Sequence, residues 1–336
     1  MEDKDIRPTT SNAIQSIGAP APVPMAGERS PLPALVQSSG PAATFAWEEF
    51  LYGKIRNANT RTAYGHAVQQ FLAHCEKLGR ELHQVTPRDV GCYLDGLSNA
   101  PATKKLHLSA IRHFFDLLVT RHVIVLNPAL SVRSERLQII EGKTPEISVA
   151  SARRLLQHID PSTLVGQRDR AIVAILIYTA VRVGAVAKLR RRDFYDVGEQ
   201  FCLRFSEKGG KSREVPARHD LRQYIGSYIV QCSLDRADKD SPLFRTAFRR
   251  TGKLTDHSMT GGDINRMVKR RLRAAGLPTS FSPHSFRVTT ITDLLSQGVP
   301  LEDVQNLAGH ADPRTTRLYD RRQRKVTRNI VERISI

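Results

Sequence analysis

A histidine and an arginine three residues apart form the strongest chemical signal in the chain. They lie in residues 282–287, SPHSFR. Ser282 is typical of a helix cap and Pro283 of the first helical position. The spacing places His284 and Arg287 on one helix face, where the helix dipole adds positive potential and favours phosphate binding. A surface pair at a helix start is the ordinary alternative.

A second segment ends in a tyrosine. Within residues 307–310, LAGH, Gly309 is typical of a helix end, and His310 follows it in a loop. Asp312-Pro313 then predicts another helix start, and Tyr319 follows that short helix. A tyrosine hydroxyl can act as a nucleophile that forms a covalent intermediate. Taken singly, His310 is a capping or loop residue and Tyr319 a half-buried packing residue.

Two cationic side chains lie upstream of these motifs. Arg182 follows a strongly apolar helix predicted over residues 167–179. An arginine at that place is either an ion-pair partner or a clamp for an oxyanion. Lys208 lies in the turn of a predicted hairpin, where its long side chain can reach into a groove, although turn lysines are usually solvated.

The elements that must position these residues are mostly helical. Residues 201–216 are the exception, because Phe201, Leu203 and Phe205 alternate with polar residues and residues 212–216 form a second extended run. The glycine-containing turn between them predicts a β-hairpin. The sequence therefore predicts a mainly α protein with a small sheet.

The chain divides into four predicted segments. Residues 1–41 hold seven of the eighteen prolines and no aromatic residue, which is typical of a disordered leader. Residues 42–130 predict a bundle of about four helices, with Asn59 and Thr86-Pro87 as helix starts. Residues 131–146 are a linker, and residues 147–336 form the second domain with a C-terminal tail helix.

Charge and cysteine usage restrict the partners. The chain has 51 Lys and Arg against 33 Asp and Glu, a net charge of +18. The leader has three basic and four acidic residues, so the excess belongs to the rest of the chain. Such a field attracts polyanions, of which nucleic acid is the commonest. Charge alone does not separate a DNA enzyme from a ribosome-associated protein or a membrane-surface protein. The four cysteines match no zinc pattern and read as buried reduced thiols of a cytoplasmic protein. No apolar run is long enough to span a membrane.

Together, the candidate residues resemble the active site of a known enzyme family. The family is the tyrosine recombinases, the phage integrase family that includes Xer-type and Cre-like enzymes. The residues that carry the resemblance, in family order, are Arg182, Lys208, His284, Arg287, His310 and Tyr319. The run 314–319, RTTRLY, is similar to the closing motif of that family, and the hairpin with its lysine is similar to another of its motifs. The resemblance covers the chain from about residue 42 to the end.

The departures from the family pattern are few. Ala185 stands where many members have a glutamate, Ala180 where a glycine is common, and Val288 where a histidine often follows the arginine. Lys208 matches the catalytic lysine better than Lys211 does. These departures concern residues that surround the candidate site, and none of the six candidate reacting residues is changed.

The resemblance implies a SAM-like core-binding bundle followed by an α+β catalytic domain. It implies that Tyr319 attacks a DNA phosphodiester and forms a 3′-phosphotyrosyl link, without ATP, metal or cofactor. Arg182, Arg287 and His310 would then hold the phosphate, and Lys208 would protonate the departing 5′ oxygen. His284 would either accept a proton or stabilise charge, and both roles stay open.

The resemblance also implies an assembly. A homo-tetramer would exchange strands between two double-stranded DNA sites through a Holliday junction, as in site-specific recombination or integration of a mobile element. An apolar stripe in the tail would pack either on its own domain or on a neighbouring protomer; its residues are Val326, Ile330, Val331 and Ile334. The alternatives are a type IB topoisomerase or telomere resolvase, a DNA-binding protein without catalysis, and a basic nucleic-acid chaperone. The target site does not follow from the sequence.

Overall fold

The computed structural model describes residues 31–134, 144–207, 210, 212–249 and 251–319. The chain forms two compact units, residues 1–138 and 139–336, and each is described by itself. Within the described ranges, no helix is long and apolar enough to cross a membrane. The predicted tail stripe, Lys208 and Lys211 lie outside the described residues.

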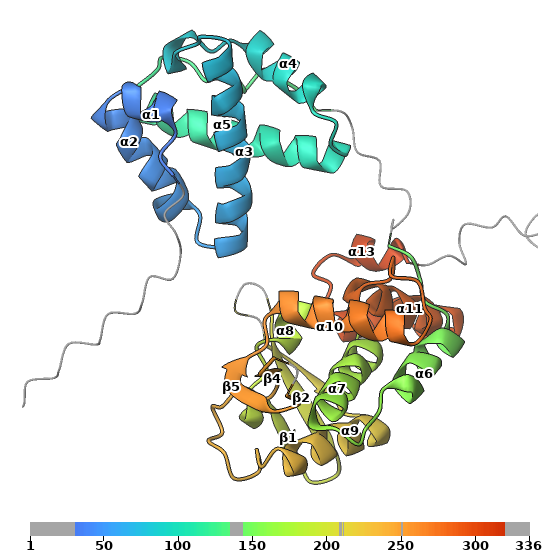
Figure 1. Cartoon of the computed structure of the whole chain (residues 1–336). Helices are drawn as coiled ribbons and strands as arrows, with labels where there is room; N and C mark the ends of the chain where they lie inside the picture. Colours follow the sequence, from blue (N-terminus) through green and yellow to red (C-terminus); the bar gives the residue numbers. More distant parts are fainter. Residues whose placement is uncertain (1–30, 135–143, 208–209, 211, 250, 320–336) are drawn as a thin grey trace, which may run out of the picture. The chain divides into compact units, whose positions relative to one another are not determined.

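The first unit is a helical bundle (Figure 1). Its elements in chain order are α1 (Ala34–Ser38), α2 (Pro41–Glu48), the π-helical η1 (Glu49–Lys54), α3 (Ala58–Lys77), the 3₁₀ turn η2 (Leu82–Gln84), α4 (Pro87–Gly96) and α5 (Pro101–Thr120). The predicted cap at Thr86 is confirmed, since its side chain accepts a hydrogen bond from the backbone of Asp89. The cap of α3 is Asn57 rather than the predicted Asn59.

Aromatic residues fill the core of this unit. Trp47 meets Phe114 edge-on, with ring centroids 5.6 Å apart, and Phe71 meets Phe115 at 5.9 Å. Edge-to-face contacts of this kind add to the free energy gained by burying the rings. The large rings hold α2, α3 and α5 together.

Two sequence-based expectations for this unit were wrong. The predicted leader extends too far, because Leu35 and Val36 on α1 are buried in the bundle core. A five-residue helix has too little apolar periodicity to be seen in a proline-rich segment. Cys92 is exposed rather than buried, whereas Cys75 lies in the core.

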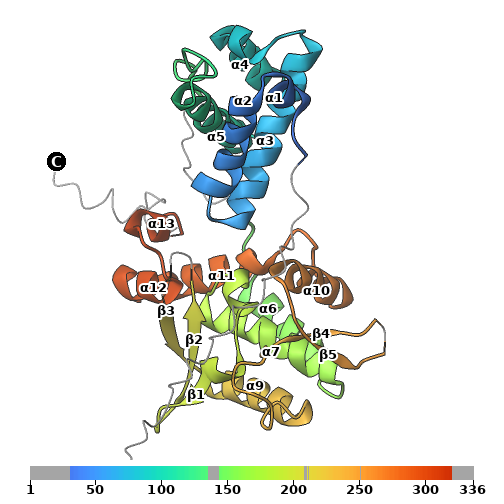
Figure 2. The same ribbon diagram turned by 90° about the vertical axis from the view of Figure 1, so that its left-hand side faces the viewer.

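The second unit combines helices with two small sheets (Figures 1 and 2). Its helices are α6 (Val149–His158), α7 (Leu164–Thr179), α8 (Val183–Val186), the 3₁₀ turn η3 (Arg191–Asp193), α9 (His219–Gln231), α10 (Gly261–Ala274), α11 (Pro283–Ser296), α12 (Leu301–Ala308) and α13 (Pro313–Arg317). Its strands are β1 (Phe194–Asp196), β2 (Phe201–Ser206), β3 (Ser212–Pro216), β4 (Arg245–Ala247) and β5 (Leu254–Ser258). The predicted mainly helical fold with a small sheet is confirmed.

The larger sheet is antiparallel with the order β1-β2-β3 (Figure 2). The predicted hairpin is confirmed, and its register pairs Ser206 with Ser212 and Phe205 with Arg213. This register places Glu207 and Arg213 at the same end of the sheet. The β4–β5 hairpin was missed, because its short strands lack the apolar alternation that marks a half-buried strand.

Helix α7 is the centre of this unit. It is buried along most of its length and packs against α9 and α11. Asp169 on α7 is fully buried and lies 2.8 Å from Arg271 and 3.1 Å from Arg270, both on α10. A buried carboxylate is tolerated when it is paired in this way. These ion pairs fix α10 to the central helix.

Helix α11 is attached at two points. The hydroxyl of Thr289 donates to the carbonyl of Ile147 at 2.8 Å, and the backbone N–H of Ile147 donates back to it at 3.0 Å. On its other side, Ile291 and Leu295 form a small apolar cluster with residues of α12. Tyr319 packs against the same cluster. The helix that carries His284 and Arg287 is thus held rigidly beside Tyr319.

Candidate active site

The start of α11 presents a histidine outward and an arginine inward. Ser282 is the cap, and its backbone N–H donates to Ser285 Oγ at 3.1 Å. Pro283 opens the helix as the sequence predicts. Arg287 is 1% exposed, whereas His284 is exposed at the surface. The cap therefore orients one buried guanidinium and one accessible imidazole at the helix N-terminus.

Arg287 is held by the carbonyl of Ala180. One terminal nitrogen, Nη1, donates to this oxygen, while Nη2 is buried and has no partner among the described residues. Ala180 ends α7 with a φ of 49°, a left-handed conformation that glycine adopts more freely. Burial, followed by the charge of Arg182, lowers the pKa of Arg287 to about 10. A free buried N–H beside a second cation is suited to bind an anion.

His310 is a buried neutral imidazole. It follows Gly309, which ends α12 with a φ of 63°. Its Nδ1 lies 2.8 Å from the hydroxyl of Thr316 on α13. Burial lowers the pKa of His310 to about 3, and the charges of Arg287 and Arg182 contribute to this shift. At neutral pH this side chain has one N–H donor and one acceptor nitrogen.

Tyr319 lies between the two histidines. Its hydroxyl is 3.5 Å from His284 Nε2, and its ring stacks on that of His310 with centroids 5.8 Å apart. The tyrosine follows α13, whose cap Asp312 accepts a hydrogen bond from the backbone of Arg314 at 2.9 Å. The phenol oxygen of Tyr319 therefore faces His284, and the ring of His310 packs against the tyrosine ring.

The structure brings five of the six predicted residues into one site. These are Arg182, His284, Arg287, His310 and Tyr319. Arg182 is the exposed cap of α8, and its charge lowers the pKa of His284, Arg287 and His310. The sixth, Lys208, lies outside the described residues. Its neighbour Glu207 is 3.4 Å from Arg182, so the hairpin reaches the site.

The comparison with family models shows which family the chain belongs to. Residues 147–325, which are more than half of the chain, match the model of the phage integrase family. The chain belongs to the phage integrase family. Residues 46–122 match the phage integrase N-terminal SAM-like domain.

Relatives of this integrase-family chain are tyrosine recombinases. XerC of Methylobacterium nodulans is 29% identical over 298 residues, covering 82% of this chain and 87% of the relative. XerD of Pseudomonas putida is 28% identical and covers 78% of this chain and 86% of its own length. The protein is accordingly an enzyme of the tyrosine recombinase type.

Solved integrase-family structures share the fold. A XerH recombinase bound to its difH DNA has a TM-score of 0.66 and 18% identity, covering 90% of this chain and 97% of its own. A lambda integrase dimer bound to a core site has a TM-score of 0.62 and 17% identity, covering 84% and 96%. At sequence identities this low, the structural similarity establishes only the fold. The roles of individual residues must be argued from the geometry of the site.

Two residues of the site were missed in the sequence. Glu207 and Arg213 lie at the turn end of the β2–β3 hairpin, with side chains only 10% and 13% exposed. Their ionic groups are 2.9 Å apart. The hairpin register alone could have paired the two positions, but it could not show that this end of the sheet meets Arg182.

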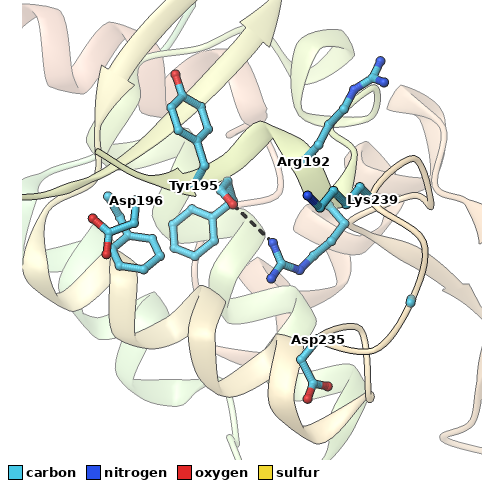
Figure 3. A pocket seen from close by; sticks show the side chains of 9 residues that line it. Arg192, Tyr195, Asp196, Asp235 and Lys239 are labelled. Atoms are coloured by element: carbon cyan, nitrogen blue, oxygen red, sulfur yellow. Dashed lines mark hydrogen bonds between the residues drawn. The ribbon is translucent and has the colours of Figure 1, made fainter. Parts of the chain in front are cut away.

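A hollow of about 520 Å³ elsewhere in the unit is separate from this site. Figure 3 shows side chains of both charge signs around it, including Arg192, Asp235 and Lys239. Phe201, at the start of β2, also lines it, whereas Glu207 follows the end of the same strand. The hollow and the candidate site therefore lie at opposite ends of β2.

Proposed function

We propose that this recombinase cuts and rejoins double-stranded DNA with Tyr319 as the nucleophile. The observation that carries the proposal is the tyrosine hydroxyl, 3.5 Å from His284 Nε2 and beside the cationic groups of Arg287 and Arg182. A nucleophile, a neighbouring basic nitrogen and anion-binding groups are the parts that phosphoryl transfer needs.

The reaction is a transesterification. The Tyr319 oxygen forms a bond to phosphorus while the bond from phosphorus to the 5′ oxygen breaks, which leaves a 3′-phosphotyrosyl link and a free 5′-hydroxyl. His284 Nε2 is placed to take the phenol proton, and Lys208 supplies a proton to the departing oxygen. Attack by a 5′-hydroxyl reverses these steps. Because the phosphoester bond is conserved, rejoining requires no ATP.

Three groups stabilise the charge that develops on the phosphate. Arg182 and Arg287 contact its non-bridging oxygens, with Arg287 Nη2 as a buried donor that has no partner in the described part of the chain. His310 adds a hydrogen bond. When the hydroxyl of Thr316 donates to Nδ1, the neutral imidazole carries its proton on Nε2 and can donate it to the phosphate.

The same proposal extends to the assembly. The net charge of +18 suits a DNA partner. A solved lambda integrase is a tetramer bound to a Holliday junction, and we propose that four copies of this chain exchange strands in that manner. The N-terminal bundle and the catalytic unit would both contact the duplex. We place the activity in the cytoplasm, where such DNA substrates lie.

Trapping the covalent intermediate tests the proposal. Duplex DNA selected from a random library by binding to the protein is nicked near the cleavage position, so that a short fragment diffuses away after attack. A denaturing gel should show a protein–DNA adduct for the wild type and none for Tyr319→Phe. Binding without an adduct, or an equal adduct from Tyr319→Phe, would contradict the proposal.

The nearest alternative is a type IB topoisomerase, which shares the covalent chemistry. Paired copies of the selected site on one plasmid distinguish the two. A recombinase produces exchanged products, whereas a topoisomerase only relaxes the supercoils.

A further inference from the structure

Glu207 is a nearly buried carboxylate between two arginines. Its side chain is 10% exposed. Oε2 accepts a hydrogen bond from Arg182 Nη1 at 3.4 Å, and Oε1 lies 2.9 Å from Arg213 Nη2. The contact with Arg213 has the distance of an ion pair but not the angles of a hydrogen bond. Charge attraction, more than one directional bond, therefore holds the carboxylate here.

The same carboxylate lies against the backbone that precedes His310. A Cβ at Gly309 would lie 2.8 Å from Glu207 Oε2 and 3.0 Å from Oε1, so the glycine leaves the space that the carboxylate fills. Glu207 thereby touches three segments: the cap of α8, strand β3 and the end of α12. In the sequence it directly precedes Lys208.

The surroundings explain why an acid is needed at this place. Three arginines lie close together here. In addition to burial, the charges of Arg182 and Arg213 both lower the pKa of Arg287. Repulsion between such groups spreads them apart unless an anion lies among them. Ala185, one turn along α8, has no carboxyl group, and the ion pair of Arg182 is with Glu207. Before DNA binds, Glu207 supplies the negative charge.

We propose that Glu207 is a positioning residue of the recombinase, which acts by orienting Arg182 toward the reacting phosphate and by fixing the hairpin against the His310 loop. The carboxylate binds one terminal nitrogen of Arg182, and among the residues that the structure describes no hydrogen bond engages its other N–H groups, which can therefore reach the phosphate. The inference rests on the proposed function, because the phosphate is the DNA phosphodiester.

The test measures the rate of adduct formation at saturating protein on the nicked DNA. Glu207→Gln keeps the shape and removes the charge, and we expect it to slow the rate about ten-fold. Glu214→Gln is the matched control, since Glu214 lies on the same hairpin, is exposed and pairs with Arg204. Glu207→Asp keeps the charge and should lose less than Glu207→Gln. Thermal unfolding verifies that each variant is folded.

A double-mutant cycle separates positioning from a general structural role. If Glu207 acts through Arg182, Glu207→Gln should slow an Arg182→Lys enzyme by clearly less than it slows the wild type. An undiminished effect in that background would overturn the inference, and so would a Glu207→Gln rate equal to that of the wild type. Absence of any adduct from the wild type would instead refute the proposed function itself.

Discussion

The Tyr319 hydroxyl lies 3.5 Å from His284 Nε2, although 35 positions separate the two residues in the chain. The apolar cluster that joins α11 to α12 brings them together, because Tyr319 packs against it just beyond α13. The basic nitrogen faces the phenol oxygen before DNA is present. A separation of 3.5 Å is ordinary for an unliganded site, where catalytic hydrogen bonds are often long.

We first predict that His284 acts as a base. Although His284 is exposed as a residue, neighbouring atoms partly desolvate its imidazole ring. This desolvation, followed by the charges of Arg287 and Arg182, lowers the pKa of His284, so the imidazole stays neutral below its ordinary value of 6.5. The cleavage rate should hold as pH falls to that value and decline only below it. His284→Gln should slow cleavage about 100-fold and remove this acid limb. The cleavage rate measured in single turnovers across pH tests this prediction. If the rate of His284→Gln declines at low pH in the same way as that of the wild type, charge stabilisation by His284 is favoured instead.

Thr316 provides a second prediction. Its buried hydroxyl is 2.8 Å from His310 Nδ1, and by donating to that nitrogen it would leave the imidazole proton on Nε2. Thr316→Val should slow adduct formation about ten-fold without weakening DNA binding. Thr315→Val is the matched control on the same short helix, because the hydroxyl that contacts His310 Nδ1 belongs to Thr316. Equal rates for both variants would show that the hydroxyl does not set the tautomer.

A third prediction concerns the two terminal nitrogens of the Arg287 guanidinium group. Nη1 binds the carbonyl of Ala180, and Nη2, which has no partner within the described ranges, is left for the phosphate. A lysine has a single terminal nitrogen and cannot make both contacts. Arg287→Lys should therefore reduce the cleavage rate by about 100-fold or more at saturating protein. Arg314→Lys, on the exposed face of α13, should leave it unchanged. Comparable losses in both variants would indicate a nonspecific charge effect.

The fourth prediction is a pH dependence of stability. The folded pKa of His310 is about 3, against 6.5 for the free side chain, so the unfolded chain binds more protons between these values. This contribution is fully present above about pH 6.5 and is lost as pH falls toward 3. From about pH 7 to about pH 5.5, His310→Gln should lose about 1 kcal/mol less of the free energy of unfolding than the wild type.

Urea unfolding followed by far-ultraviolet circular dichroism measures that difference. Trp47, the only tryptophan, is buried in the N-terminal unit and provides an internal control through its fluorescence. Its transition should not respond to His310→Gln. Parallel pH curves for wild type and variant would contradict the buried neutral state of His310.

The sequence predicts correctly those features that depend only on neighbouring residues. The cap and first-turn proline at Ser282 and Pro283, and the hairpin over residues 201–216, depend on a few neighbouring dihedral angles and side chains. The family's order of Arg182, His284 and Tyr319 was also visible, because it is a property of the chain and not of its packing. The same reasoning misplaced a cap at Asn59 and missed α1, where the local pattern is weak.

By itself, then, the sequence determined the helical class, the hairpin and a candidate set of residues for phosphoryl transfer. Only the tertiary structure decided how these residues meet. The contact of Glu207 with Arg182 and Gly309 joins segments that the chain places far apart, and the His310 pKa depends on burial and on the fields of two distant arginines. The distances between these side chains and the desolvation of His310 arise from packing between elements. A local sequence pattern contains no information about that packing.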